Sequence, residues 1–457
     1  MEKDQSQCLK FYTRKRKKNM SDLTITSDKI SDLPESLLHL ILSFLDMKQV
    51  VQTSCLSTKW RNIWKSVPVL NLDYYFQMNT SDIGDPSHVE KFMDTMDHIL
   101  FLRDDSTIQK LTISRFFHSD LARVDAWLLF AIKQQVKEIQ LRINPTYKHY
   151  CHQLPNVLFT SVIEVFKLSI FCSRFSVQLP NSMCSATQLR VLKLENIVLP
   201  KGDPGGELVL SCPILEDIFL NHCCHHDLKI LRICAPQLNN LVIYNYHAVS
   251  CKIMICTPNL TSLKLIFSCY KDYFIENLSS LVTANIEVSR LSTEILITVL
   301  NGLRNAKTLT ISGYGHKTLP GCVKLDQGLN TFSNLRCLEF IGFLPGIRDV
   351  TSLLKRSPYI ETLVFACCRI KGKEEDWGEE QSMKYLFPHL KYVRVRNFSG
   401  CENEVKLLEF LLRTVPDLQT ITITSTRSFL KSEKLDEYSV KLHSFPRASS
   451  SVTILFS

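Results

Sequence analysis

The sequence lacks the features of a membrane or secreted protein. No apolar run approaches the roughly 18–20 residues that a membrane-spanning helix needs, and the N-terminal residues do not have the pattern of a signal peptide. The 17 cysteines are odd in number, and their spacings form no compact disulfide framework. We therefore expect an intracellular protein in a reducing compartment, with no membrane partner.

The sequence also lacks a broadly basic composition in its main part. The net charge is +9, but residues 1–20 carry +5 of it, which leaves +4 for the other 437 residues. We therefore do not expect nucleic acid as a partner. Residues 1–24 are polar and predicted to be disordered. Their basic run Arg14 to Lys18 (RKRKK) fits either a nuclear-import signal or a solvated tail, so nucleus and cytoplasm both stay open as locations.

Catalytic motifs are absent as well. The sequence contains no Ser/His/Asp, zincin or kinase pattern. The glycine-rich run at 202–206 lacks the Lys-Ser/Thr ending of a phosphate-binding loop and reads as a connection between units. We predict that the chain is not an enzyme and carries no catalytic residue and no cofactor.

What the sequence does contain is a dense helical pattern between Lys29 and Leu72. Pro34 stands where a first helix can begin. The apolar residues after it share one predicted helix face: Leu37, Leu38, Ile41, Leu42 and Leu45. Asp46 can cap a second helix, with Gln49 three residues later as in a capping box. Ser57 can cap a third.

The order of residues in this stretch resembles the F-box motif. The resemblance rests on the Leu33-Pro34 pair, on the apolar pairs that follow it, and on Lys59-Trp60-Arg61. It implies that the Leu-Pro turn and the first helices bind a Skp-type adaptor, which links to a cullin and its RING subunit. The implied adaptor-binding residues are Ile30, Leu33, Pro34, Leu37, Leu38, Ile41, Leu42, Leu45, Leu56, Trp60 and Trp64. The alternative is a small three-helix domain that only caps the rest of the chain.

A short pattern then recurs along the chain: an apolar residue, two residues, an apolar residue, one residue, and an apolar residue. Its first positions are Ile108, Val136, Ile163, Leu189, Leu215, Leu238, Leu260, Leu281, Ala306, Leu335, Ile360, Leu390 and Leu418. Gaps of 21 to 30 residues suit leucine-rich repeats, in which short parallel strands stack to bury one face and line a concave sheet.

The lengths of the gaps predict the convex side. The central gaps, from Leu215 to Leu281, leave little room for a helix. Longer gaps contain helical runs at Leu121 to Val136, Leu291 to Leu303 and Val350 to Leu354, and a further helix is predicted at His88 to Leu102. We expect a convex side that is helical near both ends and irregular in the middle.

A second signature places proline two residues before many of the strands, as in Cys212-Pro213-Ile214-Leu215-Glu216. Proline ends the preceding helix or turn and favours extended backbone. This form resembles the repeats of plant F-box proteins. The strand, glycine turn, helix and strand of residues 384–423 resemble the FBD domain that follows such repeats, and they are also one more leucine-rich unit.

The run Asn221 to His226 (NHCCHH) raises the possibility of a zinc site. Contiguous ligands cannot readily surround one tetrahedral ion. Cys223 also falls where leucine-rich repeats use Asn or Cys to satisfy backbone groups. We therefore favour a structural role and predict no metal.

These patterns predict an α/β protein with a three-helix F-box and a leucine-rich-repeat solenoid, which has a parallel β concave face and a mixed helical and irregular convex face. The predicted divisions are a basic tail at 1–24, the F-box at 25–72, a connecting helix at 73–105, leucine-rich repeats at 106–383, an FBD-like repeat at 384–430 and a terminal cap or tail at 431–457.

The resemblance implies a non-catalytic subunit of an SCF-type ubiquitin ligase, in which the repeats bind an unknown target protein. The alternative is an interaction scaffold that is not coupled to degradation. Aromatic side chains near strand ends in the central repeats are candidates for the target-facing surface, because aromatics dominate binding hot spots. They are Tyr244, Tyr246, His247, Phe267 and Tyr270. Packing in the core or at its rim is the alternative role for each.

Overall fold

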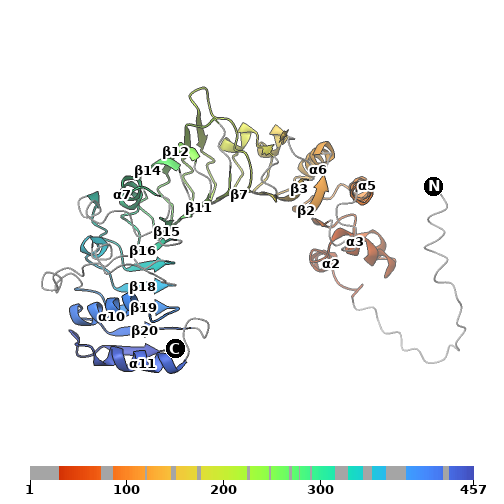
Figure 1. The fold of residues 1–457 in the computed structure, drawn as a ribbon. Helices are drawn as coiled ribbons and strands as arrows, with labels where there is room; N and C mark the ends of the chain where they lie inside the picture. The colour runs from red at the N-terminus through yellow and green to blue at the C-terminus, as the bar shows by residue number, and fades with distance from the viewer. Residues whose placement is uncertain are drawn as a thin grey trace, which may run out of the picture.

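The computed structural model describes most of the chain. The described residues are 30–73, 86–118, 121–145, 151–171, 176–223, 227–245, 249–266, 270–276, 278–288, 291–313, 328–342, 352–366, 388–425 and 432–456. The predictions for Arg14 to Lys18, Tyr246, His247 and Phe267 lie outside these residues. The described units follow one another along an arc, with helices on its outer side (Figure 1).

The described part of the chain begins with short helices that match the predicted three. They are α2 (Glu35–Leu42), α3 (Met47–Gln52), the 3-10 turn η1 (Thr53–Cys55) and α4 (Trp60–Ile63). The capping box of α3 is confirmed, because the Gln49 amide donates to Asp46 Oδ1 at 3.0 Å and the Asp46 amide donates to Gln49 Oε1 at 3.3 Å. The predicted cap at Ser57 is wrong. The third helix begins later, at Trp60, and Ser57 Oγ lies 3.2 Å from Ser31 Oγ instead.

Fifteen parallel strands form one continuous sheet. In order they are β1 (Val69–Asp73), β2 (Lys110–His118), β3 (Glu138–Pro145), β5 (Val165–Ile170), β7 (Val191–Glu195), β9 (Asp217–Asn221), β11 (Asn240–Tyr244), β13 (Ser262–Ile266), β15 (Thr283–Glu287), β16 (Thr308–Ser312), β17 (Cys337–Ile341), β18 (Thr362–Ala366), β19 (Tyr392–Arg396), β20 (Thr420–Ile423) and β21 (Thr453–Phe456). All thirteen predicted repeats are confirmed, since β2 to β20 in this sheet each begin two residues after a predicted first position.

The helices stand near the two ends of the arc, as predicted. They are α5 (Pro86–Leu102), α6 (Leu121–Lys133), α7 (Thr293–Gly302), α10 (Glu402–Thr414) and α11 (Ser432–Ser444). Residues 352–355 are also helical, whereas Val350 lies outside the described residues. Long gaps between strands can hold a helix that covers the convex side of the sheet.

The middle of the convex side is regular, and the prediction of irregular structure there is wrong. Four parallel strands form a second sheet: β8 (Glu207–Leu210), β10 (Ile230–Ile233), β12 (Val249–Cys256) and β14 (Tyr270–Glu276). Shorter elements precede it, namely β4 (Cys151–Gln153), β6 (Ser176–Gln178), η3 (Asn156–Phe159) and η4 (Asn181–Ser185). Alternate side chains such as Leu231 and Ile233 are fully buried. Neighbouring coils of equal length therefore stack strand on strand on both sides of the core.

The prolines that precede many strands open tight turns. The Leu238 amide donates to the Ala235 carbonyl at 3.2 Å, and the Leu260 amide donates to the Thr257 carbonyl at 3.1 Å, so each proline is the second residue of a four-residue turn. The fixed φ of proline favours that position. The signature therefore marks the bend from the convex side into the concave strand.

Both ends of the sheet extend beyond the predicted repeats. At the N-terminal end, β1 pairs in parallel with β2, and Leu70 and Leu72 are buried. Arg103 Nη1 also donates to the Val67 carbonyl at 2.9 Å. At the other end, the segment predicted as a cap or tail forms α11 and β21, which add one more helix and strand. The N-terminal helices are thus the first unit of the solenoid.

None of the helices in the described ranges is both long and apolar enough to cross a bilayer.

Candidate functional site

Helix α2 has two apolar faces, and only one of them is buried. Leu38 and Leu42 point into the core and are at most 1 % exposed. Leu37, Leu40, Ile41 and Phe44 follow the spacing i, i+3, i+4, i+7 on the other side, so they lie together on one side of the helix and the turn that ends it. Phe44 is 80 % exposed and Leu40 is 56 % exposed.

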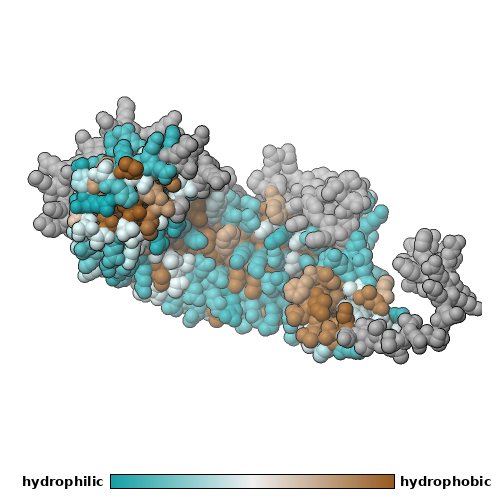
Figure 2. All heavy atoms as spheres, turned by 90° about the horizontal axis from the view of Figure 1, so that it is seen from below, coloured by the Kyte–Doolittle hydropathy of each residue, from teal (hydrophilic) through white to brown (hydrophobic). Residues whose placement is uncertain are grey.

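Two more exposed apolar side chains come from the flanking turns. Ile30 is 58 % exposed and Leu56 is 69 % exposed. We call the six residues together the apolar patch: Ile30, Leu37, Leu40, Ile41, Phe44 and Leu56. Figure 2 shows brown apolar surface gathered at the end of the molecule where the N-terminal helices lie. Concentrated exposed apolar surface on a folded protein marks a site of interaction.

The turn before α2 is held in place by the third helix. Trp60 Nε1 donates to Ser31 Oγ at 3.0 Å, and Lys59 Nζ donates to the Leu33 carbonyl at 2.8 Å and to the Ser31 carbonyl. The Leu33 amide itself donates to the Ile30 carbonyl at 3.2 Å. The Lys-Trp pair and the Leu-Pro pair of the motif therefore act together, because the first fixes the backbone of the second.

The predicted adaptor-binding residues divide between the surface and the interior. Ile30, Pro34, Leu37, Ile41 and Leu56 are exposed, and Leu33 and Leu45 are partly buried. The prediction needs correction for four residues, which are buried and form the interior of the helical unit rather than a contact surface: Leu38, Leu42, Trp60 and Trp64.

Two residues of the apolar patch, Leu40 and Phe44, were not predicted. The sequence carried a signal for them, because both continue the helical spacing that begins at Leu37. The prediction assigned a single apolar face to α2 and therefore omitted both residues.

The aromatic candidates in the central repeats lie on different sheets. Tyr244 is half-buried on β11 and faces the concave side, where its ring meets His222 edge-on at a centroid distance of 5.1 Å. Tyr270 is 3 % exposed on β14 in the second sheet, and burial raises the pKa of its hydroxyl. It belongs to the core, so its candidacy for the target-facing surface is wrong.

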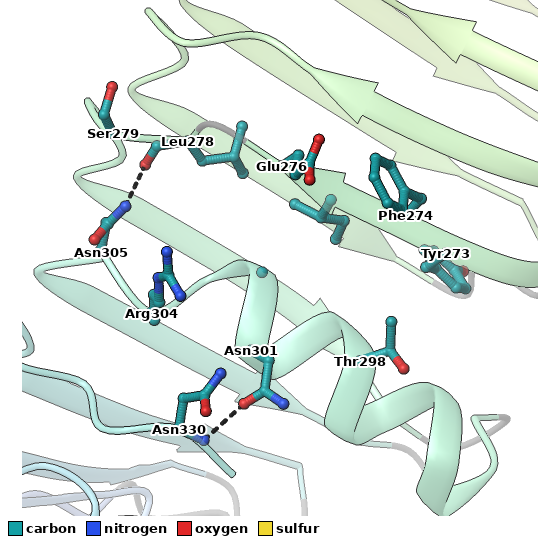
Figure 3. A pocket seen from close by; sticks show the side chains of 12 residues that line it. Tyr273, Phe274, Glu276, Leu278, Ser279, Thr298, Asn301, Arg304, Asn305 and Asn330 are labelled. Atoms are coloured by element: carbon teal, nitrogen blue, oxygen red, sulfur yellow. Dashed lines mark hydrogen bonds between the residues drawn. The ribbon is translucent and has the colours of Figure 1, made fainter. Parts of the chain in front are cut away.

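A pocket of ≈ 590 Å³ lies on the convex side, where the second sheet gives way to α7 (Figure 3). Its amide side chains serve the fold. Asn305 Nδ2 donates to the Leu278 carbonyl at 3.1 Å, and the backbone N–H of Asn330 donates to Asn301 Oδ1 at 2.8 Å. Asn301 Nδ2 also donates to the Gly328 carbonyl at 2.9 Å. These bonds join neighbouring units across the change from strand to helix.

The structural role predicted for Cys223 agrees with its surroundings. The side chain is 2 % exposed, and its thiol donates to the Leu194 carbonyl at 3.7 Å. The last three residues of the NHCCHH run, Cys224 to His226, lie outside the described residues. Among the residues that are described, no three His, Cys, Asp or Glu side chains converge as metal ligands.

Two protein families match the chain, one to each part of the fold. The F-box domain matches residues 30–72, the helices that carry the apolar patch together with most of β1. The At1g61320/AtMIF1 LRR domain matches residues 104–448, which span the strands from β2 to β20.

Relatives in Arabidopsis thaliana resemble the chain over most of its length. F-box/FBD/LRR-repeat protein At3g26920 is 28 % identical over 97 % of this chain and 100 % of its own. F-box/FBD/LRR-repeat protein At5g56420 is 26 % identical over 94 % and 99 %, and F-box/LRR-repeat protein At1g06630 is 28 % identical over 84 % and 94 %. The similarity covers the helical unit and the solenoid together.

Proposed function

Because the chain belongs to the family of plant F-box/leucine-rich-repeat proteins, we propose that it is the substrate-recognition subunit of an SCF-type ubiquitin ligase. The apolar patch docks a Skp-type adaptor, and the concave sheet binds a target protein. The observation that carries this proposal is the second, exposed apolar face of α2, within the segment that matches the F-box domain. A soluble fold gains nothing from such a face unless a partner covers it.

The proposed subunit acts inside the cell, in the nucleus or the cytoplasm, and without a catalytic site of its own. It raises the local concentration of target lysines near the transfer machinery that the adaptor brings. The continuity of β1 with β2 supports this role, because it fixes the apolar patch relative to the concave sheet. A rigid connection keeps the distance between the bound target and the transfer machinery constant, whereas a flexible linker would let that distance vary.

Charge placed in the apolar patch tests the adaptor contact. We expect Ile41→Asp combined with Phe44→Asp to weaken binding to a purified Skp-type adaptor at least about 30-fold, which corresponds to about 2 kcal/mol. Both side chains are exposed, so the fold should survive. The matched control is Val440→Asp, which changes a 73 % exposed apolar residue on α11 at the other end of the arc.

Binding measured by titration calorimetry separates the outcomes. If the unaltered chain fails to bind the adaptor, or if both sets of variants bind as it does, the adaptor proposal fails. The alternative is a scaffold that is not coupled to degradation. It gains support if the unaltered chain binds the adaptor but a bound target does not accumulate in cells that carry only the patch variant. Degradation through the adaptor requires that accumulation.

A further inference from the structure

One row of side chains crosses the centre of the concave sheet. The strand register places Lys193 of β7 beside Phe219 of β9, Phe219 beside Val242 of β11, and Val242 beside Lys264 of β13. The residues on either side of each in its strand are buried, so all four side chains face the concave solvent. We call these four residues the central row.

The two lysines of the central row have no partner among the described residues. Both are exposed, and neither forms an ion pair or a side-chain hydrogen bond in the described part of the chain. Three other concave cations differ, since Lys110 and Lys167 share Glu138 at 3.1 and 2.8 Å, and Arg396 binds Glu339 at 2.9 Å. Glu195 and Asp217 lie on the same face of β7 and β9 but are partly buried, and in the described part of the chain they form no ion pair with either lysine.

Charge along the whole concave face has the same bias. Among the strand residues of the large sheet whose side chains are described, every exposed charged side chain is basic: Arg142, Lys193, Lys264, Arg394 and Arg396. The acidic side chains of these strands are partly or fully buried: Asp73, Glu138, Glu195, Asp217, Glu287 and Glu339. A ligand that meets this face encounters cations first, which favours an acidic partner.

The centre of the row is apolar. Phe219 and Val242 are half-buried between the two lysines, and Tyr244 stands two residues beyond Val242 on the same face. An aromatic and a branched side chain offer a contact that a purely polyanionic ligand cannot use, because phosphates gain nothing from apolar surface. The row therefore fits a ligand that is acidic at two points and apolar between them.

The distance between the two lysines predicts the residue pattern of the ligand. Neighbouring strands lie about 4.8 Å apart, so three steps separate Lys193 from Lys264 by roughly 14 Å. An extended segment advances about 3.4 Å per residue, so four residues cover the same distance, and residues i, i+2 and i+4 point to the same side. A segment that fits the central row has an acidic residue at i, an apolar residue at i+2 and an acidic residue at i+4.

We propose that the central row recognises an extended acidic segment of the target protein, with the pattern acidic-x-apolar-x-acidic lying across strands β7 to β13. The segment places its two carboxylates on Lys193 and Lys264 and its apolar side chain on Phe219 and Val242. This inference rests on the proposed function, because it names the class of target that the concave sheet selects.

Peptides provide the direct test. The full-length chain is titrated with three fluorescein-labelled nine-residue peptides, and anisotropy is read at low salt. One has the core Glu-Ser-Leu-Ser-Glu, the second has the same composition with leucine moved to the end, and the third has lysine in place of both glutamates. We expect the first to bind at least about 10-fold more tightly than either of the others.

Charge reversal assigns the binding to the row. Lys193→Glu with Lys264→Glu should weaken the first peptide at least about 10-fold and favour the lysine peptide. Both positions are exposed, so folding is retained, as circular dichroism can verify. The matched control is Lys201→Glu with Lys355→Glu, which makes the same change in net charge at exposed positions off the concave sheet and should leave all three peptides unaffected.

Two results overturn the proposal: equal binding of the three peptides, or no effect of the reversal at Lys193 and Lys264. A third is tight binding of an oligo(dT) probe that the same reversal abolishes without any preference among peptides, which assigns the row to nucleic acid. Measuring adaptor binding by the Lys193→Glu, Lys264→Glu variant separates this proposal from the proposed adaptor contact. This binding should be intact, whereas loss of adaptor binding in the patch variant should leave the peptides bound.

Discussion

At the scale of single residues, the cysteines show how strongly the solenoid changes side-chain chemistry. Burial raises the pKa of the Cys184 and Cys251 thiols to about 12 and that of Cys212 to about 11. The Cys212 thiol also donates to the Met183 carbonyl at 3.1 Å. Cys55, by contrast, is exposed on the turn after α3. The thiolate is the reactive form, so these thiols should differ widely in reactivity.

We expect native-state alkylation to separate them. With iodoacetamide at pH 8, Cys55 should react within minutes, whereas Cys184, Cys212 and Cys251 should stay unmodified until the chain is unfolded, because burial blocks access and their raised pKa leaves almost no thiolate. Peptide mapping by mass spectrometry checks this. Comparable labelling of all four in the folded chain would contradict the packing of the central coils.

The aromatic candidates also show that the fold gives similar residues different roles. Tyr244 and Tyr270 look alike in the sequence, since each is a tyrosine near a strand end in the central repeats. One faces the concave solvent and the other lies in the core of the second sheet. Residue type did not distinguish them, because the difference depends on which of two stacked sheets each strand joins.

At the scale of elements, the start of α10 carries two glutamates with opposite pH behaviour. Glu404 is 2 % exposed, and burial raises its pKa even though its Oε2 accepts from the Ser399 amide at 3.0 Å and the Cys401 amide at 3.2 Å. Glu402 is exposed, and its hydrogen bond to Lys406, at 2.9 Å, lowers its pKa. The two lie two residues apart in one helix.

The sign of each shift gives a prediction. Glu404 holds its proton more tightly in the folded chain, so its contribution to stability is present below its ordinary pKa of 4.5 and is lost as pH rises. Glu404→Gln should therefore gain stability relative to the unaltered chain between pH 5 and pH 7.5. Urea unfolding at both values measures the gain.

The matched variant Glu402→Gln should show the reverse. Its carboxylate stabilises the folded chain fully above the ordinary pKa of 4.5, and that contribution is lost as pH falls below this value. Relative to the unaltered chain, the variant should therefore gain stability as pH falls below 4.5 and change little between pH 5 and pH 7.5. If the relative stability of the two variants changes in the same direction with pH, burial does not determine the pKa of Glu404.

Helix α2 and the second sheet show what can be predicted about elements. Period and gap length predicted where helices and concave strands lie, because each face must be buried by a neighbour. They did not predict that α2 is apolar on two sides, since a pattern cannot tell a side buried in the chain from one kept for a partner. They also missed the convex strands, whose alternation in ILRI and KIMI was present but short.

At the scale of the whole molecule, each unit packs against its neighbours, and the Arg396–Glu339 ion pair skips only one strand, so damage should stay local. Leu70 of β1 is fully buried at the junction between the helical unit and the first repeat. We expect Leu70→Asp to destabilise this junction by about 3 kcal/mol or more, because an unpaired charge is buried. Hydrogen exchange should accelerate in residues 30–73 and β2 while β9 to β20 in the large sheet keep their protection.

The matched control is Leu241→Asp, which buries the same charge in β11 at the centre of the arc. Its exchange should accelerate around β9 to β13 and leave the N-terminal helices protected. Uniform acceleration along the chain in either variant would mean that the solenoid unfolds as one cooperative unit, against a nearest-neighbour description.

The sequence by itself determined the architecture: the helical unit, the thirteen repeat strands and the helices near both ends follow from periodicity, because local patterns must match the faces they bury. Only the tertiary structure decided which side of α2 stays exposed, that β1 joins the two parts into one sheet, and that Lys193, Phe219, Val242 and Lys264 stand in one row. Each residue of the row follows a predicted first position by four residues, but the in-register pairing that sets residues more than twenty positions apart side by side is a property of the folded sheet.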